Sequence, residues 1–164
     1  MLYLRDNLTN GTAKVTTSFE LVRELDYLIF NFVAEESKLY SYSNRNNDDL
    51  WKGSVCEVFL DLGDDFYYEF EVAPNGATFI AKIKDQKVSF CDSDFFLSTA
   101  KIEGSTYFVS MTINLSKLKH PKRIRYNAFR VETPSKNKEQ ILSALNPTLC
   151  STFHVREKFI PLDL

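Results

Sequence analysis

Hydrophobic and polar residues alternate with a period of two along much of this chain. In residues 14–21, Val15, Thr17, Phe19 and Leu21 fall on one face, and charged or hydroxyl-bearing residues fall on the other. A β-strand sends successive side chains to opposite sides of its sheet, so this alternation predicts a half-buried strand. Residues in the range 27–33 are nearly all apolar, which predicts a central strand.

The same patterns recur through the rest of the chain, and turn residues separate the segments. Pro74-Asn75-Gly76 marks a tight turn, because Asn-Gly adopts positive φ at low cost. The other predicted strands cover residues 55–61, 66–73, 77–83, 97–102, 107–113 and 124–133. Short helical turns are expected within residues 114–118, 136–144 and 156–159, and a polar surface loop at 42–49.

Many short strands with frequent turns predict an all-β fold, namely a two-sheet antiparallel β-sandwich. A parallel α/β fold would need crossover helices of about a dozen residues between strands, and no such pattern is present. The 164 residues fit a single domain that spans positions 1–164. The aromatic content of 14% favours strands, where flat rings pack on a pleated surface.

Charge and hydropathy argue against two classes of partner. The net charge is −2 and no basic block occurs, so the chain lacks the positive footprint that nucleic-acid binding requires. No run of about 18 apolar residues is present, so no membrane span is expected. No signal peptide is identified at the amino terminus, which predicts a soluble cytoplasmic protein; a mature secreted form is the alternative.

The cysteines and histidines do not form a metal-binding pattern. Cys56, Cys91 and Cys150 are an odd, sparse set without CxxC spacing, which argues against a disulfide framework or a zinc site. His120 and His154 lie far apart in the sequence. We therefore expect no metal and no cofactor from the residues alone, and thiols that suit a reducing compartment.

The period of two also predicts which polar side chains share a face. Acids, aromatic rings and one arginine fall on the non-core faces of three strands, if Phe129 and Val131 of the last strand point inward. A sheet with such a face suits hydroxyl-rich ligands, because rings stack on sugars and charged groups bond hydroxyls. The alternative is the ordinary solvated face of a sandwich. The residues on these faces are Glu57, Phe59, Asp61, Tyr67, Glu69, Glu71, Tyr126, Arg130 and Glu132.

Catalysis by these acids is a further alternative. Glu57, Glu69 and Glu71 include candidate pairs for a glycoside hydrolase, which needs two carboxyl groups roughly 5–5.5 or 6.5–9.5 Å apart across a cleft. The sequence indicates no environment that would raise a carboxyl pKa. It also contains no nucleophile elbow, phosphate loop or dinucleotide fingerprint. We therefore assign no catalytic residue and expect that the chain is not an enzyme.

Four segments of the chain resemble the signatures of the family-nine carbohydrate-binding-module-like proteins, which belong to the wider DOMON-like group of β-sandwiches. The segments follow the family's order and fall within residues 28–162. They read LWKGSVCEVFLD (50–61), YYEFEVAPNG (67–76), NAFRVE (127–132) and FHVREKF (153–159). The resemblance implies a jelly-roll-like sandwich with a sugar site on its concave sheet.

The resemblance also implies how a sugar would be held. In sugar-binding members, two tryptophans sandwich a sugar at the end of a glycan chain, and polar side chains bond its hydroxyls. Trp51 and Glu57 match the first tryptophan and a following glutamate, whereas residues 143–147, where the second tryptophan is expected, read SALNP. Calcium is implied by the resemblance only. The candidate sugar contacts are Trp51, Glu57, Tyr67, Glu69, Glu71, Asn75, Arg130 and Glu132.

Several of these residues have a structural interpretation beside the functional one. Trp51 is either a stacking platform or a plug that closes the edge of the sandwich. Arg130 and Glu132 suit an ion-pair network with Glu57 or Glu71. The signature residues Phe153, His154 and Phe159 are assigned a structural role, in which His154 bonds backbone groups and pins the last segment.

Two main hypotheses about function follow. The first is a non-catalytic carbohydrate-binding-like module whose partner is a mono- or oligosaccharide, present as a monomer or weak homodimer. The second is a sandwich that has lost its sugar site and acts as an interaction or structural protein. Whether the ring of Trp51 is exposed over a groove separates the two.

Overall fold

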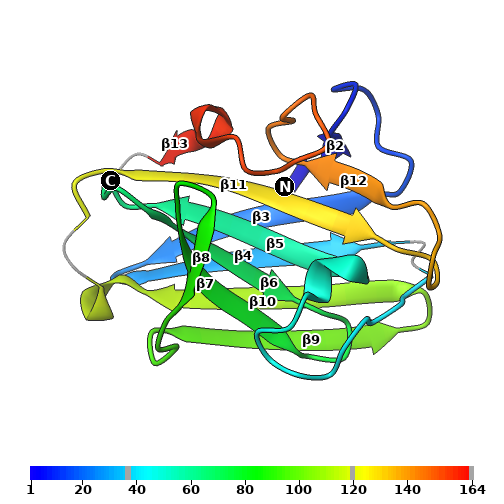
Figure 1. Ribbon diagram of the computed structural model, residues 1–164, viewed down its shortest axis with the longest axis horizontal. Helices are drawn as coiled ribbons and strands as arrows, with labels where there is room; N and C mark the ends of the chain where they lie inside the picture. Colours follow the sequence, from blue (N-terminus) through cyan, green and yellow to red (C-terminus); the bar gives the residue numbers. More distant parts are fainter. Residues whose placement is uncertain (36–37, 119–120, 163–164) are drawn as a thin grey trace.

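Two antiparallel β-sheets lie face to face in the computed structural model, which describes residues 1–35, 38–118 and 121–162 (Figure 1). The five-stranded sheet has the order β1-β3-β4-β10-β9. The eight-stranded sheet has the order β2-β12-β11-β5-β6-β7-β8, and β13 pairs with β11. The predicted two-sheet antiparallel sandwich is therefore confirmed. His120, which the sequence analysis considered as a metal ligand, lies outside the described residues.

The described elements have the following bounds. The smaller sheet contains β1 (Leu2–Tyr3), β3 (Thr17–Glu24), β4 (Tyr27–Ala34), β9 (Phe96–Glu103) and β10 (Thr106–Asn114). The larger sheet contains β2 (Arg5–Asp6), β5 (Val55–Asp61), β6 (Tyr67–Val72), β7 (Thr78–Lys84), β8 (Lys87–Phe90), β11 (Ile124–Glu132), β12 (Ile141–Ala144) and β13 (Ile160–Leu162). Three 3-10 turns, η1 (Leu50–Lys52), η2 (Leu115–Lys117) and η3 (Arg156–Lys158), are the helical elements of the described chain. None of these turns is long or apolar enough to cross a membrane.

The interior between the sheets is filled by alternate residues of each strand. On β5 these are Cys56, Val58 and Leu60, all completely buried. They belong to one apolar cluster with side chains from β4 and β10 of the other sheet, including Phe30 and Met111. This packing is the reason that the period-two pattern predicted these strands correctly.

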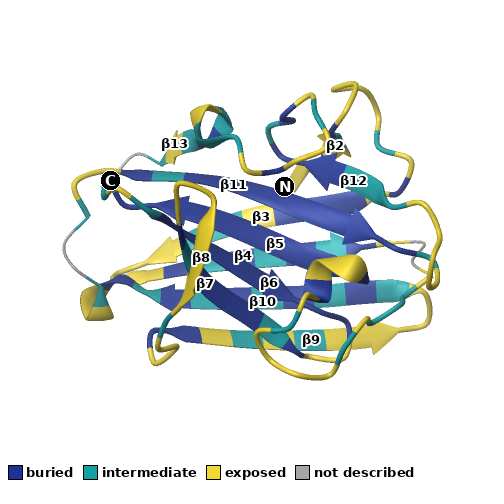
Figure 2. Cartoon of the chain, in the orientation of Figure 1, coloured by how far each residue is buried: buried dark blue, intermediate teal, exposed yellow. Residues whose placement is uncertain are grey.

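The opposite face of the larger sheet is also covered. A second apolar cluster lies there, and it takes residues from β5, β6, β7 and β11 together with the segment that ends at η3. Every residue of β5 and of β6 is consequently buried, as the dark colouring of both strands shows in Figure 2. The second cluster includes Leu50, Phe59, Tyr67, Phe79, Phe129, Phe153 and Phe159.

Three local predictions differ from the structure. Residues 136–144 hold no helix; Ile141–Ala144 forms β12, because the backbone of β11 offers antiparallel partners there. The strand predicted at 14–21 begins three residues later, at Thr17. Strand β8 was missed because all four of its residues are exposed, so it has no inward-facing apolar period. The turns predicted near residues 115 and 156 are confirmed as η2 and η3.

Gly53 joins η1 to β5 at a point where two backbone segments touch. A Cβ at this position would lie 2.6 Å from both the Tyr40 oxygen and the Tyr42 nitrogen. We therefore expect Gly53→Ala to lower the free energy of unfolding by about 1–3 kcal/mol, as overpacking does. Urea unfolding tests this, with Gly11→Ala as the control, because the nearest atom there is a side-chain hydroxyl at 3.3 Å. Equal stability of the two variants would contradict the expectation.

Candidate functional site

The outer face of the larger sheet, turned away from the sandwich interior, contains a pocket of about 540 Å³. Its floor is formed by β5, β6 and β11. Its walls come from η1, from the β7–β8 hairpin and from residues 151–154. The lining residues are Asp49, Trp51, Glu57, Phe59, Glu69, Glu71, Phe79, Val88, Phe90, Val131, Gln140, Leu142, Ser151, Thr152, Phe153 and His154.

Trp51 stands at the rim of this pocket. Its residue surface is 46% exposed, although Leu50, its neighbour in η1, is completely buried. The Trp51 backbone oxygen accepts a hydrogen bond from the Gln140 side chain (2.7 Å), which fixes η1 against the segment before β12. An exposed residue at the rim of a pocket has the placement that a stacking platform needs, and this exposure does not suit a plug that closes the edge of the sandwich.

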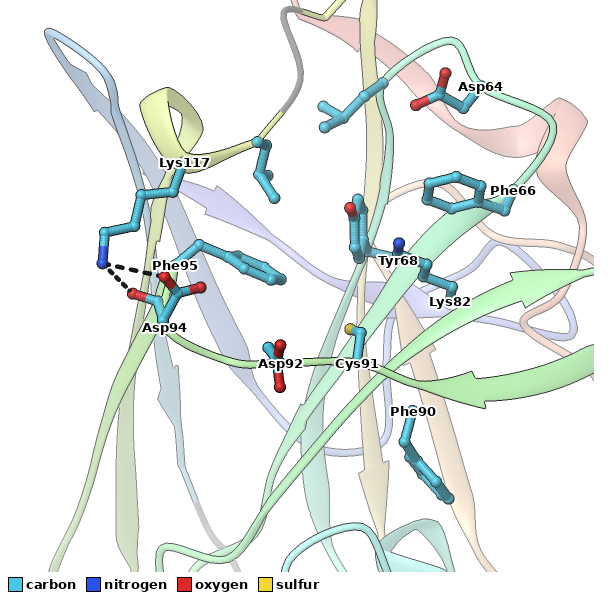
Figure 3. A pocket seen from close by; sticks show the side chains of 12 residues that line it. Asp64, Phe66, Tyr68, Lys82, Phe90, Cys91, Asp92, Asp94, Phe95 and Lys117 are labelled. Atoms are coloured by element: carbon cyan, nitrogen blue, oxygen red, sulfur yellow. Dashed lines mark hydrogen bonds and ion pairs between the residues drawn. The ribbon is translucent and has the colours of Figure 1, made fainter.

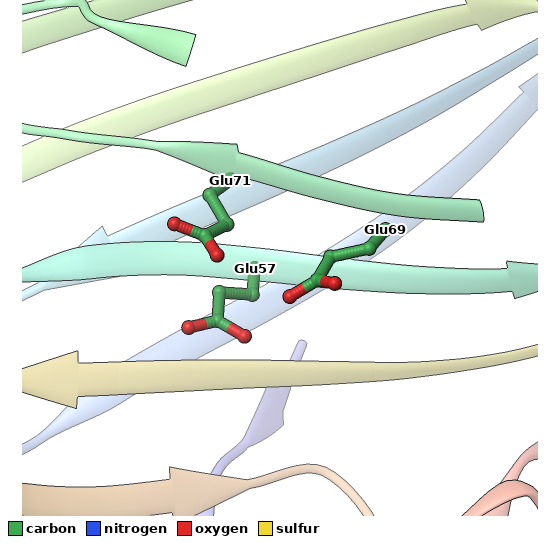
Figure 4. Close-up of side chains that lie close together, drawn as sticks. All are labelled: Glu57, Glu69 and Glu71. Carbon is green, nitrogen blue, oxygen red and sulfur yellow. The ribbon is translucent and has the colours of Figure 1, made fainter. Parts of the chain in front are cut away.

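Three carboxylates lie together on the pocket floor. Glu57 on β5 is directly opposite Glu71 on β6, and Glu69 is two residues before Glu71 on the same face. Figure 4 shows the three carboxyl groups turned toward one another, and one oxygen from each lies within 4.8 Å of the others. All three residues are buried, with at most 6% of their surface exposed. The shared face predicted from the sequence is confirmed, but it is not a solvated one.

The electrostatics of this cluster favour protonated carboxyl groups. Burial, followed by the charge of Glu69, raises the pKa of Glu57 well above its ordinary value. Burial and the charges of Glu57 and Glu69 do the same for the pKa of Glu71. Burial raises the pKa of Glu69 to about 7. No lysine or arginine is among the described residues that line the pocket, so the protein supplies no formal positive charge to offset these acids.

His154 forms the wall beside Glu69. Its Nδ1 lies 2.6 Å from the Tyr67 hydroxyl, and its Nε2 lies 4.0 Å from a Glu69 oxygen. Burial lowers the pKa of His154, so the ring is neutral near pH 7. When the Tyr67 hydroxyl donates to Nδ1, the ring hydrogen sits on Nε2 and faces Glu69. The ring also stacks on Phe59, with centroids 4.9 Å apart.

The interpretation of the signature residues is supported in part. Phe153 stacks on Phe129 with centroids 4.2 Å apart, and Phe159 packs edge-on against Tyr67. Both phenylalanines belong to the outer-face cluster, as a structural role requires. His154 pins the last segment, but its ring bonds the Tyr67 side chain rather than backbone groups, and it also lines the pocket.

Arg130 and Glu132 do not belong to this site, which corrects the prediction for β11. Phe129 pairs with Glu57 and Arg130 with Cys56, so the arginine points into the sandwich. The Arg130–Glu132 pair is a buried ion pair of 2.5 Å, and Arg130 also donates to the Thr17 hydroxyl. The prediction failed because both faces of β11 are buried. The rule that apolar side chains point inward therefore could not show which face lies between the sheets.

Two other candidates lie outside the pocket lining. Asn75 belongs to the β6–β7 turn, where its side chain donates to the Ser43 oxygen and accepts from the Ala77 backbone N–H. Tyr67 faces the correct side of the sheet but is buried under Phe159, and it contacts the pocket lining through His154 and Phe59. Both residues are therefore supports and not direct contacts of the pocket.

A second, larger hollow of about 770 Å³ opens elsewhere on the molecule (Figure 3). Tyr68, Lys82 and Cys91 line it, and Lys117 donates to the Asp94 backbone oxygen at its edge (2.8 Å). None of the candidate sugar contacts lines this hollow. Its lining lacks a cluster of buried, unneutralised groups, so the pocket beside Trp51 is the stronger functional candidate.

Sequence reasoning missed several walls of the pocket. Phe79 and Phe90 come from the β7–β8 hairpin, and Gln140 and Thr152 come from irregular segments. The alternation of Phe79 with the buried Ile80 was a usable signal for Phe79, because it places that ring on the face of Glu71. The exposed strand β8 and the irregular segments carried no such signal.

Comparison with known proteins agrees with this arrangement at the level of the fold. No family model matches the chain. A presumed carbohydrate-binding protein from Bacteroides uniformis superposes with a TM-score of 0.81 at 15% identity, over 98% of this chain and 84% of that one. A carbohydrate-binding module of family 9 from Caldicellulosiruptor kristjanssonii, solved with glucose, gives 0.65 at 16% identity over 87% and 73%. Its complex with cellotriose gives 0.63 at 16% identity over 87% and 69%.

A curated relative is more similar in sequence. The chain is 27% identical over 168 residues to a protein of Arthroderma benhamiae named "Extracellular protein", which covers 87% of this chain and 76% of the relative. The solved structures show that this chain has the fold of the family-nine carbohydrate-binding modules. The resemblance drawn from the four sequence segments is thereby confirmed for the fold.

Proposed function

We propose that this chain is a non-catalytic carbohydrate-binding module that holds one sugar ring in the pocket beside Trp51. The observation that carries the proposal is the exposed Trp51 ring at the rim of a pocket whose floor contains hydrogen-bonding carboxyl groups. The ring supplies a flat apolar surface, and the carboxyl groups bond hydroxyls. Similar folds in solved complexes with glucose and cellotriose support this assignment.

The segment where the second tryptophan was expected does not fill the pocket. Leu145, from the segment where that tryptophan was expected, is buried between the sheets and leaves the pocket open. Phe90, Phe79 and Phe153 supply other aromatic surface in its lining. An open, aromatic-lined pocket supports a retained sugar site and argues against the hypothesis that the site was lost.

The arrangement of the acids argues against glycoside hydrolysis. Hydrolases place two carboxyl groups on either side of the scissile bond, roughly 5–5.5 or 6.5–9.5 Å apart. Here oxygens of Glu57, Glu69 and Glu71 approach within 4.8 Å, on adjacent strands of one floor. The three acids lie on one floor of the pocket and do not face one another across a cleft, so the proposed role is binding.

We also propose that the protein acts outside the cell. The Arthroderma benhamiae relative is named an extracellular protein, and no comparison supports the cytoplasmic expectation. Cys56, Cys91 and Cys150 are free thiols, so the proposed location rests on the relative alone.

Titration of the fluorescence of Trp51, the single tryptophan, tests the proposal directly. Glucose, cellobiose and xylose are expected to change its emission in a saturable manner, because a sugar on the ring displaces water. Isothermal calorimetry is expected to show that Trp51→Ala weakens binding about tenfold, which corresponds to the loss of about 1.4 kcal/mol of stacking. Leu149→Ala, at an exposed residue outside the pocket lining, is the control. Absence of binding of every sugar at millimolar concentration would refute the proposal.

A further inference from the structure

The three acids of the pocket floor lack a positive partner. Among the described residues, neither oxygen of Glu71 has a hydrogen-bond donor other than the neighbouring Glu69 carboxyl group, although Glu71 is completely buried and lines the pocket. Figure 4 shows its carboxyl group directed toward that of Glu57. His154 lies nearest to Glu69, at 4.0 Å, and it is a neutral ring near pH 7. A buried polar group without a partner is unfavourable, so this one indicates a missing ligand group.

The surroundings of the cluster favour an organic cation over a metal ion. Calcium takes six to eight oxygen ligands, which are carboxylates, backbone or amide carbonyls, and waters. Here β5 is paired on both sides, with β11 and β6, and β6 is paired on both sides, with β5 and β7. The floor therefore has few free carbonyls to offer. The pocket is also far larger than a hydrated ion, and Trp51, Phe79 and Phe90 give it apolar walls suited to the body of an organic ligand.

The spacing of the carboxyl groups allows one primary ammonium group to contact all three. Such a group has three N–H donors, one for each of Glu57, Glu69 and Glu71. Oxygens bonded at about 2.8 Å to one tetrahedral nitrogen lie about 4.6 Å apart. The observed oxygens all lie within 4.8 Å of one another. The cluster is therefore compact enough for one ammonium group to reach an oxygen of each glutamate.

We propose that the ligand of this pocket is a saccharide with a protonated primary amine, whose ammonium group binds among Glu57, Glu69 and Glu71. This inference rests on the proposed function, because it names the sugar class for the same site. The ammonium group donates to the carboxyl oxygens and favours their ionised form, and the sugar ring lies against Trp51. An N-acetylated sugar lacks the charge and two of the three donors.

Calorimetric titration with glucosamine, N-acetylglucosamine and glucose tests the inference, at a pH slightly below neutral where the amine is protonated. Glucosamine is expected to bind about tenfold more tightly than either other sugar, since hydrogen bonds between charged groups are the stronger kind. Methylamine is expected to compete with glucosamine, because it carries the ammonium group alone. Each titration is repeated with calcium chloride and with a chelator, and no change is expected.

Single glutamine variants locate the interaction. Glu57→Gln, Glu69→Gln and Glu71→Gln are each expected to reduce the preference for glucosamine over glucose to about threefold or less, because glutamine keeps a hydrogen-bonding oxygen and removes the charge. Glu20→Gln, at an exposed acid of the smaller sheet, is the matched control and keeps the full preference. Thermal unfolding of every variant shows that it is folded.

The outcomes separate the two levels of the proposal. Equal binding of all three sugars overturns the amine inference and leaves the carbohydrate-binding module intact. Binding that requires calcium and is abolished by the chelator also overturns it, in favour of a metal among the same acids. If no sugar binds but methylamine does, the carbohydrate proposal fails and the carboxyl cluster is a site for simple amines.

Discussion

The Arg156→Ala variant is expected to lose about 3 kcal/mol or more of its free energy of unfolding, because the change leaves a buried charge without its main partner. Asp61 at the end of β5 is completely buried, and Arg156 of η3 bonds both of its oxygens, at 2.8 and 3.0 Å. Burial alone would raise the pKa of Asp61, but the bonds from Arg156 and from the Gly63 N–H outweigh it and lower this pKa. Chemical denaturation near neutral pH measures the loss.

The control for this variant is Lys158→Ala in the same 3-10 turn. The contacts given for Lys158 involve its backbone, so its stability is expected to stay within about 0.5 kcal/mol of the parent. A loss below about 1 kcal/mol in Arg156→Ala would show that Arg123, 3.8 Å from Asp61, compensates the charge. The expected loss also affects the pocket, because η3 begins two residues after His154 of the pocket wall.

Glu71→Gln is expected to stabilise the ligand-free protein at mildly alkaline pH. The pKa values of Glu57, Glu69 and Glu71 are raised in the folded state, so this state holds more protons than the unfolded chain above the ordinary value of 4.5. Stability therefore falls as pH rises through about 4.5 to 7 and beyond. The shift of Glu69 alone, to about 7, corresponds to a loss on the order of 3 kcal/mol.

Unfolding free energies measured from about pH 5 to about pH 8 check this result. The parent is expected to show a steady decline, and Glu71→Gln a shallower one, since it removes one of three repelling carboxyl groups. His154 acts in the opposite direction, because its lowered pKa adds stability as pH rises through its ordinary value of 6.5. Asp49 also lines the pocket. Asp49 and His154 are unchanged in the variant, so the difference between the two stability curves reports the contribution of the three glutamates. Parallel curves would show that the cluster does not titrate in this range.

The sequence predicted the fold and part of the site for physical reasons that can be stated. Strands buried on one face at a time, such as β10, show a clear period of two, and this period selects the sandwich. The same period placed Glu57, Glu69 and Glu71 on one face. It failed at β11, where Phe129 packs under Phe153 of a distant segment, and where the buried partner of Arg130 is Glu132 of the same strand.

The burial of the acids was beyond the reach of local patterns. A carboxylate on the outer face of a strand is normally solvated, and only the segment near Phe153 and the β7–β8 hairpin turns this face into a pocket. His154 was singled out by its signature, but its position beside Glu69 follows from long-range packing. The walls from β8 depend on an edge strand whose residues are all exposed, which gives no apolar pattern.

The alternation along β5 and β6 also protects the pairing of these strands during folding. Apolar Val58 and Phe70 pair on the inner face, while Glu57 and Glu71 pair on the outer one. A shift of one residue would exchange the two faces and drive carboxyl groups between the sheets, away from any opening to water. The acids that weaken the native state at high pH therefore weaken the misregistered state far more. Their replacement by apolar residues is expected to yield a more stable chain that folds less faithfully.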